Sequence, residues 1–574
     1  MLKYITFFLL FTSSIYSQWS VNTGMNNPLV IAPFNQLNAK CISDGDNGVI
    51  IVWEDNRTQT SGNRDIYAQR INRLGVRQWG DSTGIPIAAK IGEDERYFDV
   101  CSDGKGGAII LWDDAVQPAI TILKGQRVTK SGVKMWSDTG IVVNANGNRQ
   151  SQSKISTDNN GGCFYAYLTS EISSNDYEVK ANRLDSNGNK LWGAGTFICQ
   201  ADGNASEIDA CTTTDNGFFV VWGDPRNSKI TWTDLYCQKL NSSGVIQWQA
   251  NGFPLCTSNY TQQYERCIPD NNGGAFIVWN DNRNSDSITT RVDIFCQRMR
   301  SNGTPVFGAN GKAICVTQES QYRPDPVTDG KGGVIVNWND FRNGPSSPFN
   351  IDIYAQRFDS LGNMKWTENG INVCDAPLSQ NNNKSVSDGN FGAIITWDDR
   401  RAGTSIYDIY AQRIDSNGVL KWSPDDVLVS NATGNQLKPQ IVKTSDGAIL
   451  CFEDTRAGSS DYNLYTMKIQ DYGGPVNVTP IANQITPDNI YLAQNYPNPF
   501  NPVTNIKFSL PASNFVSLKI YNALGKEVSS LINEKLSAGA YEVKFDGSNL
   551  SSGVYYYKLV SDDFSLVRNM LLIK

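Results

Sequence analysis

Apolar and polar residues alternate along this chain in units that recur about every 57 residues. The stretch Asp388–Trp422 is one such unit. It contains a tight turn, an apolar run ending at Trp397, a loop, and the run Asp-Ile-Tyr-Ala-Gln-Arg, in which apolar and polar side chains alternate. A period of two is typical of β-strands, and the Gly and Asn residues of the turns accept the positive φ angles of tight hairpins. Each unit therefore predicts short strands joined by hairpins.

Two columns of large aromatic residues run through the units. The first column ends the apolar strand, and the second lies after the following hairpin. Large aromatic side chains at equivalent positions are expected to pack between neighbouring units, where each buries a large area. The first column comprises Trp53, Trp112, Trp222, Trp279, Trp338 and Trp397. The second comprises Trp79, Trp136, Trp192, Trp248, Phe307, Trp366 and Trp422.

The number of units indicates a closed ring. Residues 18–470 have room for about eight units of four strands each. The last unit lacks a second-column aromatic of its own, whereas Trp19 is followed by residues like those that follow Trp79. We therefore expect an all-β, eight-bladed β-propeller in which an N-terminal strand completes the last blade. An open β-solenoid is the alternative, but it would not need its two ends to complete one unit.

An Asp and an Arg follow the first aromatic column in most units, as Asp399 and Arg401 follow Trp397. A pair repeated around a ring is more typical of an ion pair that fixes a loop than of a series of active sites. We therefore interpret the first aromatic column, Asp399 and Arg401 as structural.

Units that depart from the repeat are the better places to look for a ligand. The second unit continues from Trp112 to Asp114 without the Arg, and the third unit, which contains Glu171 and Tyr177, loses both the Trp and the pair. Trp232 is the one Trp outside both columns, and an aromatic residue on a loop can stack on a sugar or contact a protein. We therefore take Trp232, Asp114, Tyr177 and Glu171 as ligand-binding candidates, with drift of unused loops as the alternative.

Composition excludes several classes of function. The chain has no histidine, so a Ser-His-Asp triad and a His-ligated metal are excluded. Any catalysis would depend on carboxylates, Tyr, Lys or a bound cation. The net charge of −7 and the pI near 5.0 disfavour a nucleic-acid partner, which requires a basic face.

Neither the cysteines nor the oxygen-rich turns identify a metal site or a disulfide. The 12 cysteines fall mostly in columns shared with Val, which is typical of small buried residues, although Cys199–Cys211 or Cys256–Cys267 disulfides are open alternatives. There is no Cys-x-x-Cys pair for zinc. The Asp-Gly turns could offer oxygen atoms to calcium, but a turn function explains them without it. We therefore predict no catalytic residues, no metal ligands and no cofactor, with calcium as an alternative.

The chain begins with the pattern of a secretory signal peptide. In residues 1–17 a Lys near the start precedes an apolar run, and small polar residues come before Gln18. The run is much shorter than the roughly 20 residues of a membrane-spanning helix, and no later segment is long and apolar enough to be one. We expect cleavage after Ser17, with Ser14 as the alternative.

The C-terminal part has a different pattern. Residues 471–487 are rich in Pro, Gly and Asn and are predicted to be a linker. Residues 488–574 then contain about seven short alternating runs, typical of a small immunoglobulin-like β-sandwich.

Residues 488–574 carry the run Tyr-Pro-Asn-Pro-Phe-Asn-Pro, Leu-Gly and Ser-Gly-Val-Tyr motifs further on, and a terminal Lys. Together these motifs resemble the type A C-terminal sorting domain of the type IX (Por) secretion system. The matching residues are Pro497, Asn498, Pro499, Phe500, Asn501, Pro502, Gly525, Gly553 and Lys574. The resemblance implies a bacterium of the Bacteroidetes/Chlorobi kind, Sec export, interaction with the type IX machinery, and a secreted or outer-surface-anchored protein.

Three functions remain open for the repeat region, which resembles secreted bacterial β-propellers of no defined activity. The first is a non-catalytic binding protein for a glycan or protein ligand, favoured by the absence of His and by the regular Asp column. The second is a hydrolase or lyase acting on carbohydrate with carboxylates or Tyr in the central funnel. The third is a structural component of a surface layer.

Overall fold

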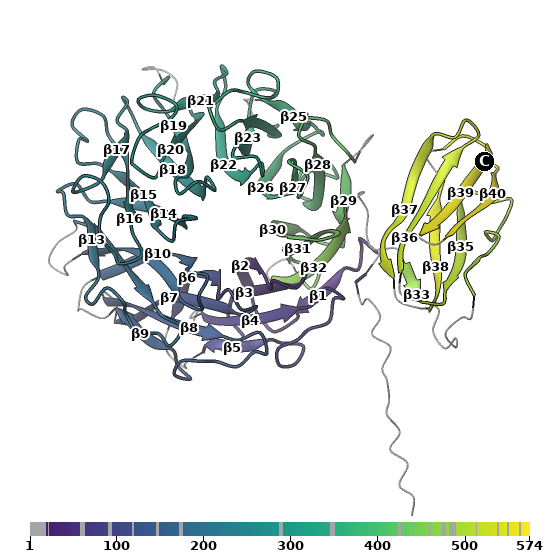
Figure 1. Cartoon of the computed structure of the whole chain (residues 1–574), viewed down its shortest axis with the longest axis horizontal. Coiled ribbons are helices and arrows are strands. Elements are labelled where there is room, and N and C mark those ends of the chain that lie inside the picture. Colours follow the sequence, from purple (N-terminus) through teal and green to yellow (C-terminus); the bar gives the residue numbers. More distant parts are fainter. Residues whose placement is uncertain are drawn as a thin grey trace, which may run out of the picture. The chain divides into compact units, whose positions relative to one another are not determined.

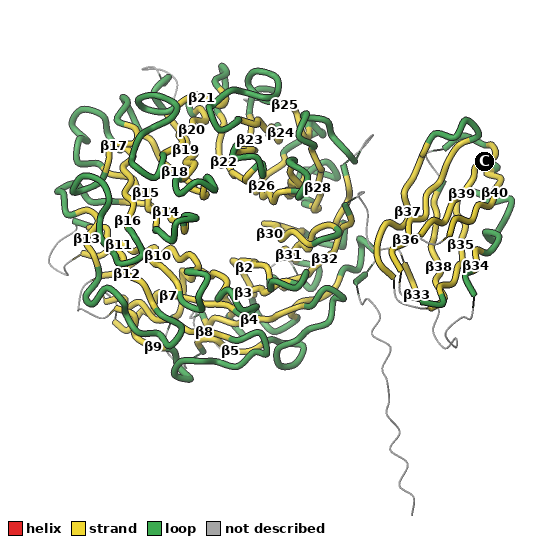
Figure 2. Tube along the Cα trace, in the orientation of Figure 1, coloured by secondary structure: helices red, strands yellow, loops and turns green. Residues whose placement is uncertain are grey.

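The computed structural model describes residues 19–20, 22–57, 64–89, 94–117, 120–144, 149–170, 176–285, 291–344, 350–422, 426–458, 461–471, 478–480, 489–512, 514–536, 539–547, 550–561 and 564–574. The predicted signal peptide and Glu171 lie outside these residues. Contacts divide the chain into two compact units: residues 22–475, and residues 476–574 together with 1–21. Throughout its described residues the chain is all-β (Figure 2), and none of them forms a helix long and apolar enough to span a membrane.

Within the described part of residues 22–475 the strands form eight four-stranded antiparallel sheets. The first strands of the sheets are β2 (Gln36–Ser43), β6 (Glu95–Ser102), β10 (Arg149–Thr157), β14 (Ser206–Thr212), β18 (Gln262–Pro269), β22 (Gln321–Thr328), β26 (Gln380–Ser387) and β30 (Gln436–Thr444). The second strands are β3 (Val49–Asp55), β7 (Ala108–Gln117), β11 (Cys163–Ser170), β15 (Phe218–Asp224), β19 (Ala275–Asp281), β23 (Val334–Asp340), β27 (Ala393–Asp399) and β31 (Gly447–Asp454).

The third strands are β4 (Asp65–Ile71), β8 (Ile120–Val128), β12 (Glu178–Leu184), β16 (Asp234–Leu240), β20 (Asp293–Met299), β24 (Asp352–Phe358), β28 (Asp408–Ile414) and β32 (Asn463–Gln470). The fourth strands are β5 (Ile85–Ala88), β9 (Ile141–Asn144), β13 (Thr196–Cys199), β17 (Phe253–Cys256), β21 (Lys312–Cys315), β25 (Ile371–Cys374), β29 (Val427–Ser430) and β1 (Asn27–Val30).

The sheets stand around a central opening, with the first strand of each sheet nearest to it (Figure 1). Each first strand contacts the first strand of the next sheet along the chain, and β2 also contacts β30. The second strands are buried over nearly their whole length, because their two faces pack against both neighbouring sheets. This arrangement is propeller-like, as the repeat predicted.

One sheet takes its strands from both ends of this unit. Its order is β1-β32-β31-β30, and β1 pairs antiparallel with β32, with Asn27 opposite Thr466. Asn26, which is buried, donates a hydrogen bond from Nδ2 to the carbonyl oxygen of Val429 (3.1 Å) and accepts one at Oδ1 from Arg456 Nη2 (3.0 Å). The segment before β2 is therefore held by side chains as well as by strand pairing.

The first aromatic column and the Asp and Arg columns meet in one cluster in six of the eight sheets of the described residues. Trp397 Nε1 donates to Asp399 Oδ2 at 2.8 Å, and Arg401 donates to the same oxygen at 2.7 Å through Nη2. The guanidinium of Arg401 lies 3.9 Å from the ring centroid of Tyr410, a cation–π contact. The same pairing recurs at Asp55 and Arg57 and in four further sheets. The cluster fixes the loop between the second and third strands.

The second aromatic column links neighbouring sheets. Trp366 Nε1 donates to the carbonyl oxygen of Ser416, which lies in the next sheet's hairpin, at 3.2 Å. Gly370 then passes over Trp338 with a φ of 85°, and a Cβ at this position would meet the indole at 2.5 Å. A glycine is required here by both the backbone angle and the space.

The cysteines are free thiols in all twelve positions, so the disulfides Cys199–Cys211 and Cys256–Cys267 are not formed. Arg226 instead donates to Cys199 Sγ at 3.1 Å, and Arg283 donates to Cys256 Sγ at 3.0 Å. These thiols extend the Asp and Arg clusters and are otherwise buried. The column is therefore explained by packing and weak hydrogen bonding.

The C-terminal unit contains two four-stranded sheets, β33-β38-β35-β34 and β37-β36-β39-β40. Their strands are β33 (Val478–Pro480), β34 (Tyr491–Leu492), β35 (Val503–Leu510), β36 (Asn514–Asn522), β37 (Glu527–Leu536), β38 (Gly539–Asp546), β39 (Gly553–Ser561) and β40 (Phe564–Leu572). One apolar core, built from both sheets, joins them. The strand β33 lies inside the segment that the sequence predicts to be a linker, because β38 has an edge with which it can pair.

The Pro-rich motif of this unit is anchored to its last strand. Phe500 is buried in the core, its N–H donates to the carbonyl oxygen of Leu571 at 2.9 Å, and its own carbonyl oxygen accepts from the N–H of Ile573 at 3.0 Å. Asn498 Oδ1 accepts from the N–H of Leu571 at 2.9 Å, and the N–H of Lys574 donates to Ser552 Oγ at 3.0 Å. The motif and the C-terminus therefore stabilise each other, which explains why both belong to one sequence signature.

Candidate functional site

Every first strand carries a bulge where it borders the central opening. The pairing between first and second strands shifts register at equivalent places in all eight sheets of the described residues. The bulged residue has a positive φ and is not glycine, a backbone conformation that carries strain unless neighbours support it. The bulged residues are Asn38, Tyr97, Gln152, Glu207, Tyr264, Arg323, Asn382 and Lys438.

In several sheets a carboxylate of the preceding sheet supports the bulge. This carboxylate belongs to the residue that follows the first aromatic column. Glu54 Oε1 accepts from the N–H of Tyr97 at 3.1 Å, and Asp398 Oδ2 accepts from the N–H of Lys438 at 3.0 Å. Glu453 Oε1 accepts from the N–H of Asn38 at 2.9 Å. A hydrogen bond to a charged acceptor in a buried place is among the stronger ones in a protein.

Two consecutive sheets have an amide at this position, where the third and fourth sheets have Leu168 and Gly223 and the remaining four have a carboxylate. Asn280 and Asn339 follow Trp279 and Trp338, and the bulges that they precede are Arg323 and Asn382. Asn339 donates to the carbonyl oxygen of Gln380 at 3.0 Å. Asn280 is 1% exposed, and neither its Oδ1 nor its Nδ2 finds a hydrogen-bond partner among the described residues. An unpaired buried amide is costly, so this position is a candidate for a hydrogen bond to a ligand or an ordered water.

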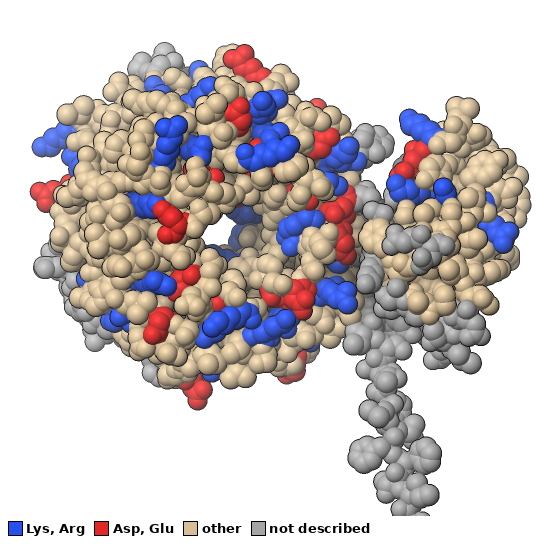
Figure 3. Space-filling view, in the orientation of Figure 1, with Lys and Arg blue, Asp and Glu red and all other residues tan. Residues whose placement is uncertain are grey.

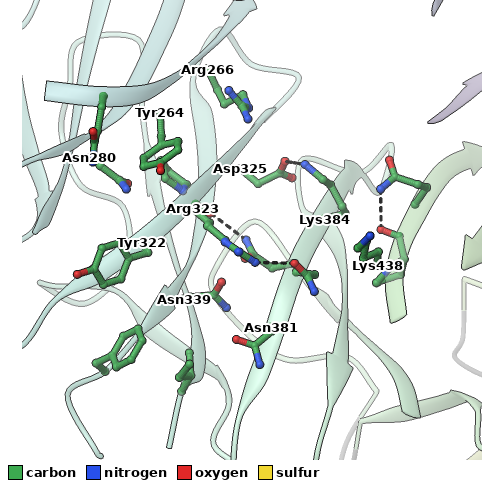
Figure 4. A pocket seen from close by; sticks show the side chains of 18 residues that line it. Tyr264, Arg266, Asn280, Tyr322, Arg323, Asp325, Asn339, Asn381, Lys384 and Lys438 are labelled. Carbon is green, nitrogen blue, oxygen red and sulfur yellow. Dashed lines mark hydrogen bonds and ion pairs between the residues drawn. The ribbon is translucent and has the colours of Figure 1, made fainter. Parts of the chain in front are cut away.

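A pocket of about 720 Å³ lies at this place. Its wall comes mainly from β18, β22, β26 and β30, and Phe341 and Ile351 add the two ends of the β23–β24 loop. Figure 4 shows Asn280, Tyr264, Tyr322 and Arg323 together on this wall. The pocket therefore lies at the end of the sheets where the second and third strands are joined.

Amides and aromatic rings dominate the pocket wall. Tyr322 and Phe341 meet edge to face, with ring centroids 5.5 Å apart at 77°. Tyr264, which is 47% exposed, offers a further ring. The amide residues on the wall are Gln263, Asn280, Asn339, Asn381, Asn382, Asn383 and Gln440. Rings that accept stacking and amides that both donate and accept hydrogen bonds suit a polyhydroxylated ligand.

The charged residues of the wall are mostly basic. They are Arg266, Arg323, Lys384 and Lys438, and Asp325 is the single carboxylate among the lining residues that the structure describes. Asp325 is held by Lys384 Nζ at 3.1 Å (Figure 4). The N–H and Oγ of Ser385 also donate to Asp325. Arg323 Nη1 donates to Asn382 Oδ1 at 2.5 Å, so its hydrogen bond within the pocket is to a neutral group.

Charges alternate in sign around the opening, two residues after each bulge. The residues in ring order are Lys40, Asp99, Lys154, Asp209, Arg266, Asp325, Lys384 and Gln440. Neighbours pair across sheets: Lys40 with Asp99 at 2.8 Å, Lys154 with Asp209 at 3.6 Å, and Lys384 with Asp325 at 3.1 Å. Both kinds of charge are visible around the opening in Figure 3. The sequence of signs is interrupted at Gln440, which belongs to the pocket wall.

Burial and nearby charges shift the pKa of several groups near the pocket. Burial raises the pKa of Glu265 to about 8, aided by the charge of Glu207, and neither carboxyl oxygen has a hydrogen-bond partner among the described residues. Burial opposes the charged form of Arg266, but Asp209, Glu265 and Asp325 outweigh it and raise the pKa of that guanidinium. Burial raises the pKa of Asp398 to about 6 despite its hydrogen bonds from Asn382 and Lys438.

Asp114 and Tyr177, which were chosen from the sequence, lie apart from this pocket. Asp114 is fully buried and forms an ion pair with Lys124, which leaves Trp112 Nε1 without a hydrogen-bond partner among the described residues. Tyr177 packs against a core cluster between neighbouring sheets, and its N–H donates to Asn204 Oδ1 at 3.2 Å. These two departures from the repeat are accommodated by packing.

Trp232 is the sequence candidate that lies nearest to the pocket along the fold. It is 61% exposed on the β15–β16 loop, with its ring centroid 6.5 Å from that of Tyr260. The N–H of Gln262 donates to the carbonyl oxygen of Thr233 at 2.9 Å, which ties this loop to the start of β18, the strand that carries Tyr264. Trp232 and the pocket therefore share one end of the sheets.

The sequence contains a signal for the pocket in the residue that follows the first aromatic column. The residue after the first aromatic column is acidic at Glu54, Asp113, Asp398 and Glu453. It is an amide at Asn280 and at Asn339 of the next unit. The exception is a change within the repeat rather than a loss of the repeat.

Hydrogen bonds to backbone N–H groups and ion pairs with Arg organise the Asp-Gly turns. Asp388 Oδ1 accepts from the N–H groups of Asn390 and Gly392, and Oδ2 accepts from Arg413 Nε at 3.0 Å. Six turns of the described residues pair with an Arg in this way. Both carboxylate oxygens therefore serve the turn, and calcium stays an untested alternative.

Comparison with known proteins assigns the C-terminal part. Residues 494–574 match the family model described as the secretion system C-terminal sorting domain, as predicted. The match indicates export through the type IX system, with secretion or attachment at the outer surface. No curated protein matches the chain.

Solved structures are similar to the chain only distantly. PorZ of Porphyromonas gingivalis, an essential surface component of the type IX secretion system, is 12% identical, with 94% of this chain and 71% of PorZ covered at a TM-score of 0.38. An α-L-arabinofuranosidase of Fusarium graminearum is 9% identical, with 78% and 98% covered at a TM-score of 0.37. A Dyadobacter fermentans protein of unknown function is 8% identical, with 56% and 94% covered at a TM-score of 0.33.

Proposed function

We propose that this protein is a non-catalytic glycan-binding β-propeller that type IX secretion delivers to the cell surface or the medium. In this proposal residues 1–17 are a signal peptide, residues 18–470 form eight blades, residues 471–487 link the two domains, and residues 488–574 direct export. The ring closes where β1 pairs with β32, and the contact between β2 and β30 supports this closure.

The observation that carries the binding function is the pocket between Asn280 and Gln440. Its wall combines exposed aromatic rings with many side-chain amides, the groups that stack on sugar faces and exchange hydrogen bonds with hydroxyls. Trp232 extends the same end of the ring with a further exposed ring. A glycan chain could therefore occupy the pocket and continue toward Trp232.

The charged groups favour binding over glycoside hydrolysis. Hydrolysis commonly requires two carboxyl groups about 5–10 Å apart, one on each side of the scissile bond. Among the described lining residues Asp325 is the one carboxylate, and Lys384 and Ser385 engage it. Nothing on this wall supplies its counterpart.

A glycan array probed with the full mature chain tests the proposal. We expect retention on a restricted set of oligosaccharides, and loss of that retention in Tyr322→Ala, which removes a ring from the wall. The exposed residue Leu361, which lies in a hairpin remote from the pocket wall, provides the control variant Leu361→Ala. Absence of binding to every glycan would overturn the proposal, and release of products from a bound glycan would favour the hydrolase.

A further inference from the structure

We infer that the pocket recognises a carboxylate on its glycan, which makes the ligand an acidic, uronic-type oligosaccharide. The inference rests on the proposed function and names the substrate class of the same site. It starts from the residue that each sheet places after its first-column aromatic.

The repeat itself defines what is missing at the pocket. At Glu54, Asp398 and Glu453 a protein carboxylate accepts the N–H of a left-handed bulge in the next sheet. At the Asn280 position the equivalent bulge is Arg323, and Asn280 Oδ1 accepts no hydrogen bond among the described residues. The scaffold has therefore omitted one carboxylate from a place that is built to receive one.

The groups around this place match a carboxylate from outside. Arg323 supplies a guanidinium whose hydrogen bond within the pocket goes to the neutral Asn382, and guanidinium groups bind carboxylates through paired hydrogen bonds. Asn280 supplies an unpartnered amide N–H₂ that is 1% exposed. An anionic oxygen between them would satisfy a buried donor and pair a cation in a single step.

The local charge balance also favours an anion. Four basic residues and one acidic residue line the pocket, Lys438 is paired with Glu453 outside the lining at 3.2 Å, and the sign alternation around the opening stops there at neutral Gln440. Gln440 lies between Lys384 and Lys40 in ring order. The alternation of signs would place an acid at this position, and the chain has a neutral amide there instead. A ligand carboxylate would restore the balance that the neighbouring sheets achieve internally.

The experiment compares matched probes on the full mature chain. The probes are a panel of uronic-acid oligosaccharides, the same oligosaccharides after carboxyl reduction, and sulfated oligosaccharides of neutral sugars, all measured by calorimetry at low and high salt. We expect binding of at least one uronic probe, at least tenfold weaker binding of its reduced form, and weaker binding at high salt.

Two variants locate the carboxylate. Arg323→Gln should weaken uronic binding at least tenfold because the guanidinium is lost. Asn280→Asp should do the same for a different reason, because it supplies the missing carboxylate from within the protein and repels that of the ligand. Arg300→Gln and Asn302→Asp, in an exposed hairpin remote from the pocket wall, make the same chemical changes and should leave binding intact.

The outcomes separate this inference from the proposed function. Equal binding of a uronic probe and its reduced form, or binding of sulfated probes alone, would overturn the carboxylate and leave a glycan-binding pocket. Full binding by Asn280→Asp, with its fold verified by thermal unfolding, would also overturn it. Failure of every acidic and neutral probe to bind would overturn both proposals.

Discussion

On one side of the central opening Glu54 and Glu453 each accept the N–H of a strained bulge in the next sheet, whereas on the other side Asn280 meets no partner. The backbone of the two sides is the same, since every first strand carries the bulge. The two sides differ in whether the chain satisfies its own donors. In a repeat protein, a candidate ligand site is thus a copy that keeps the backbone of the repeat but leaves a buried polar group without a partner.

Opening the ring on the carboxylate side should have the largest effect. Removal of residues 22–33 deletes β1 and the buried Asn26 and leaves the edge of β32 uncovered. We expect a loss of at least about 4 kcal/mol in the free energy of unfolding, because pairing, burial and buried hydrogen bonds disappear together. Urea unfolding checks this, and an unchanged midpoint would contradict closure by β1.

Breaking one carboxylate contact should have the next largest effect. Glu54 accepts from the N–H of Tyr97, from Asn38 Nδ2 and from Arg64, so Glu54→Ala should cost about 3 kcal/mol by leaving these donors unpaired. Asn280→Ala, its counterpart on the pocket side, should cost about 1 kcal/mol or less because no hydrogen bond is lost. Equal costs in urea unfolding would remove the distinction between the two sides.

The pocket side also contains a carboxyl group that lacks such a contact, and it should make stability depend on pH. The pKa of Glu265 rises from 4.5 to about 8 in the folded protein, so the unfolded chain loses this proton at a lower pH than the folded chain does. Stability should therefore fall as the pH rises from 4.5 to 8, by an amount on the order of 3 kcal/mol at pH 7.

The variant Glu265→Gln keeps the neutral form at every pH. It should flatten the fall between pH 5 and pH 8 in urea unfolding, whereas Glu368→Gln, at an exposed position, should not. A fall of the same size in the Glu265→Gln variant would contradict this assignment. Glu207, Asp209 and Arg266 are the charged groups around Glu265, and they are unchanged in this variant.

Placing a carboxylate at position 280 should change the free energy of unfolding by a smaller amount, and in the stabilising direction. Asn280→Asp removes no hydrogen bond and offers an acceptor to the bulge at Arg323, so we expect a gain of about 1 kcal/mol above the pKa of the new group. Urea unfolding at pH 8 measures it. A destabilised variant would show that the amide side has a different geometry from the acidic side.

The smallest effect on stability should come from Trp232. Its side chain is 61% exposed, so Trp232→Ala should change the free energy of unfolding by less than about 0.5 kcal/mol. If the ligand extends from the pocket to this ring, the variant should also weaken oligosaccharide binding about threefold. A large loss of stability without any change in binding would assign Trp232 to the scaffold.

The period of the sequence was sufficient to predict an all-β, propeller-like fold, because strands, turns and aromatic columns are local patterns. The C-terminal sorting domain was predicted from its motif, and the family match confirms it. The pocket could not be predicted in the same way. Its wall depends on bulges, which are shifts in the pairing register between strands. It also depends on Asn280 of one sheet lying before the bulge at Arg323 in the next sheet.

Candidate residues from the sequence were chosen where the repeat is most altered. At Asp114 the unit lacks the Arg, and Lys124 supplies a positive charge inside the same sheet. Large departures had been compensated by packing, whereas the uncompensated change was the conservative one from acid to amide at Asn280. Unsatisfied hydrogen bonding, which only the structure reveals, points to the pocket instead.

The alternating charges around the opening also restrict how such a chain can evolve. The fold repeats with every unit, but the signs from Lys40 to Lys384 repeat with every second unit. Gain or loss of one unit would set two like charges side by side, a penalty of about 1 kcal/mol that accumulates with each mismatch. Lineages of this array are therefore expected to change by duplicating or deleting units in pairs. Neutral Gln440 is already the spacer between two lysines, and deleting its unit alone would bring Lys384 against Lys40.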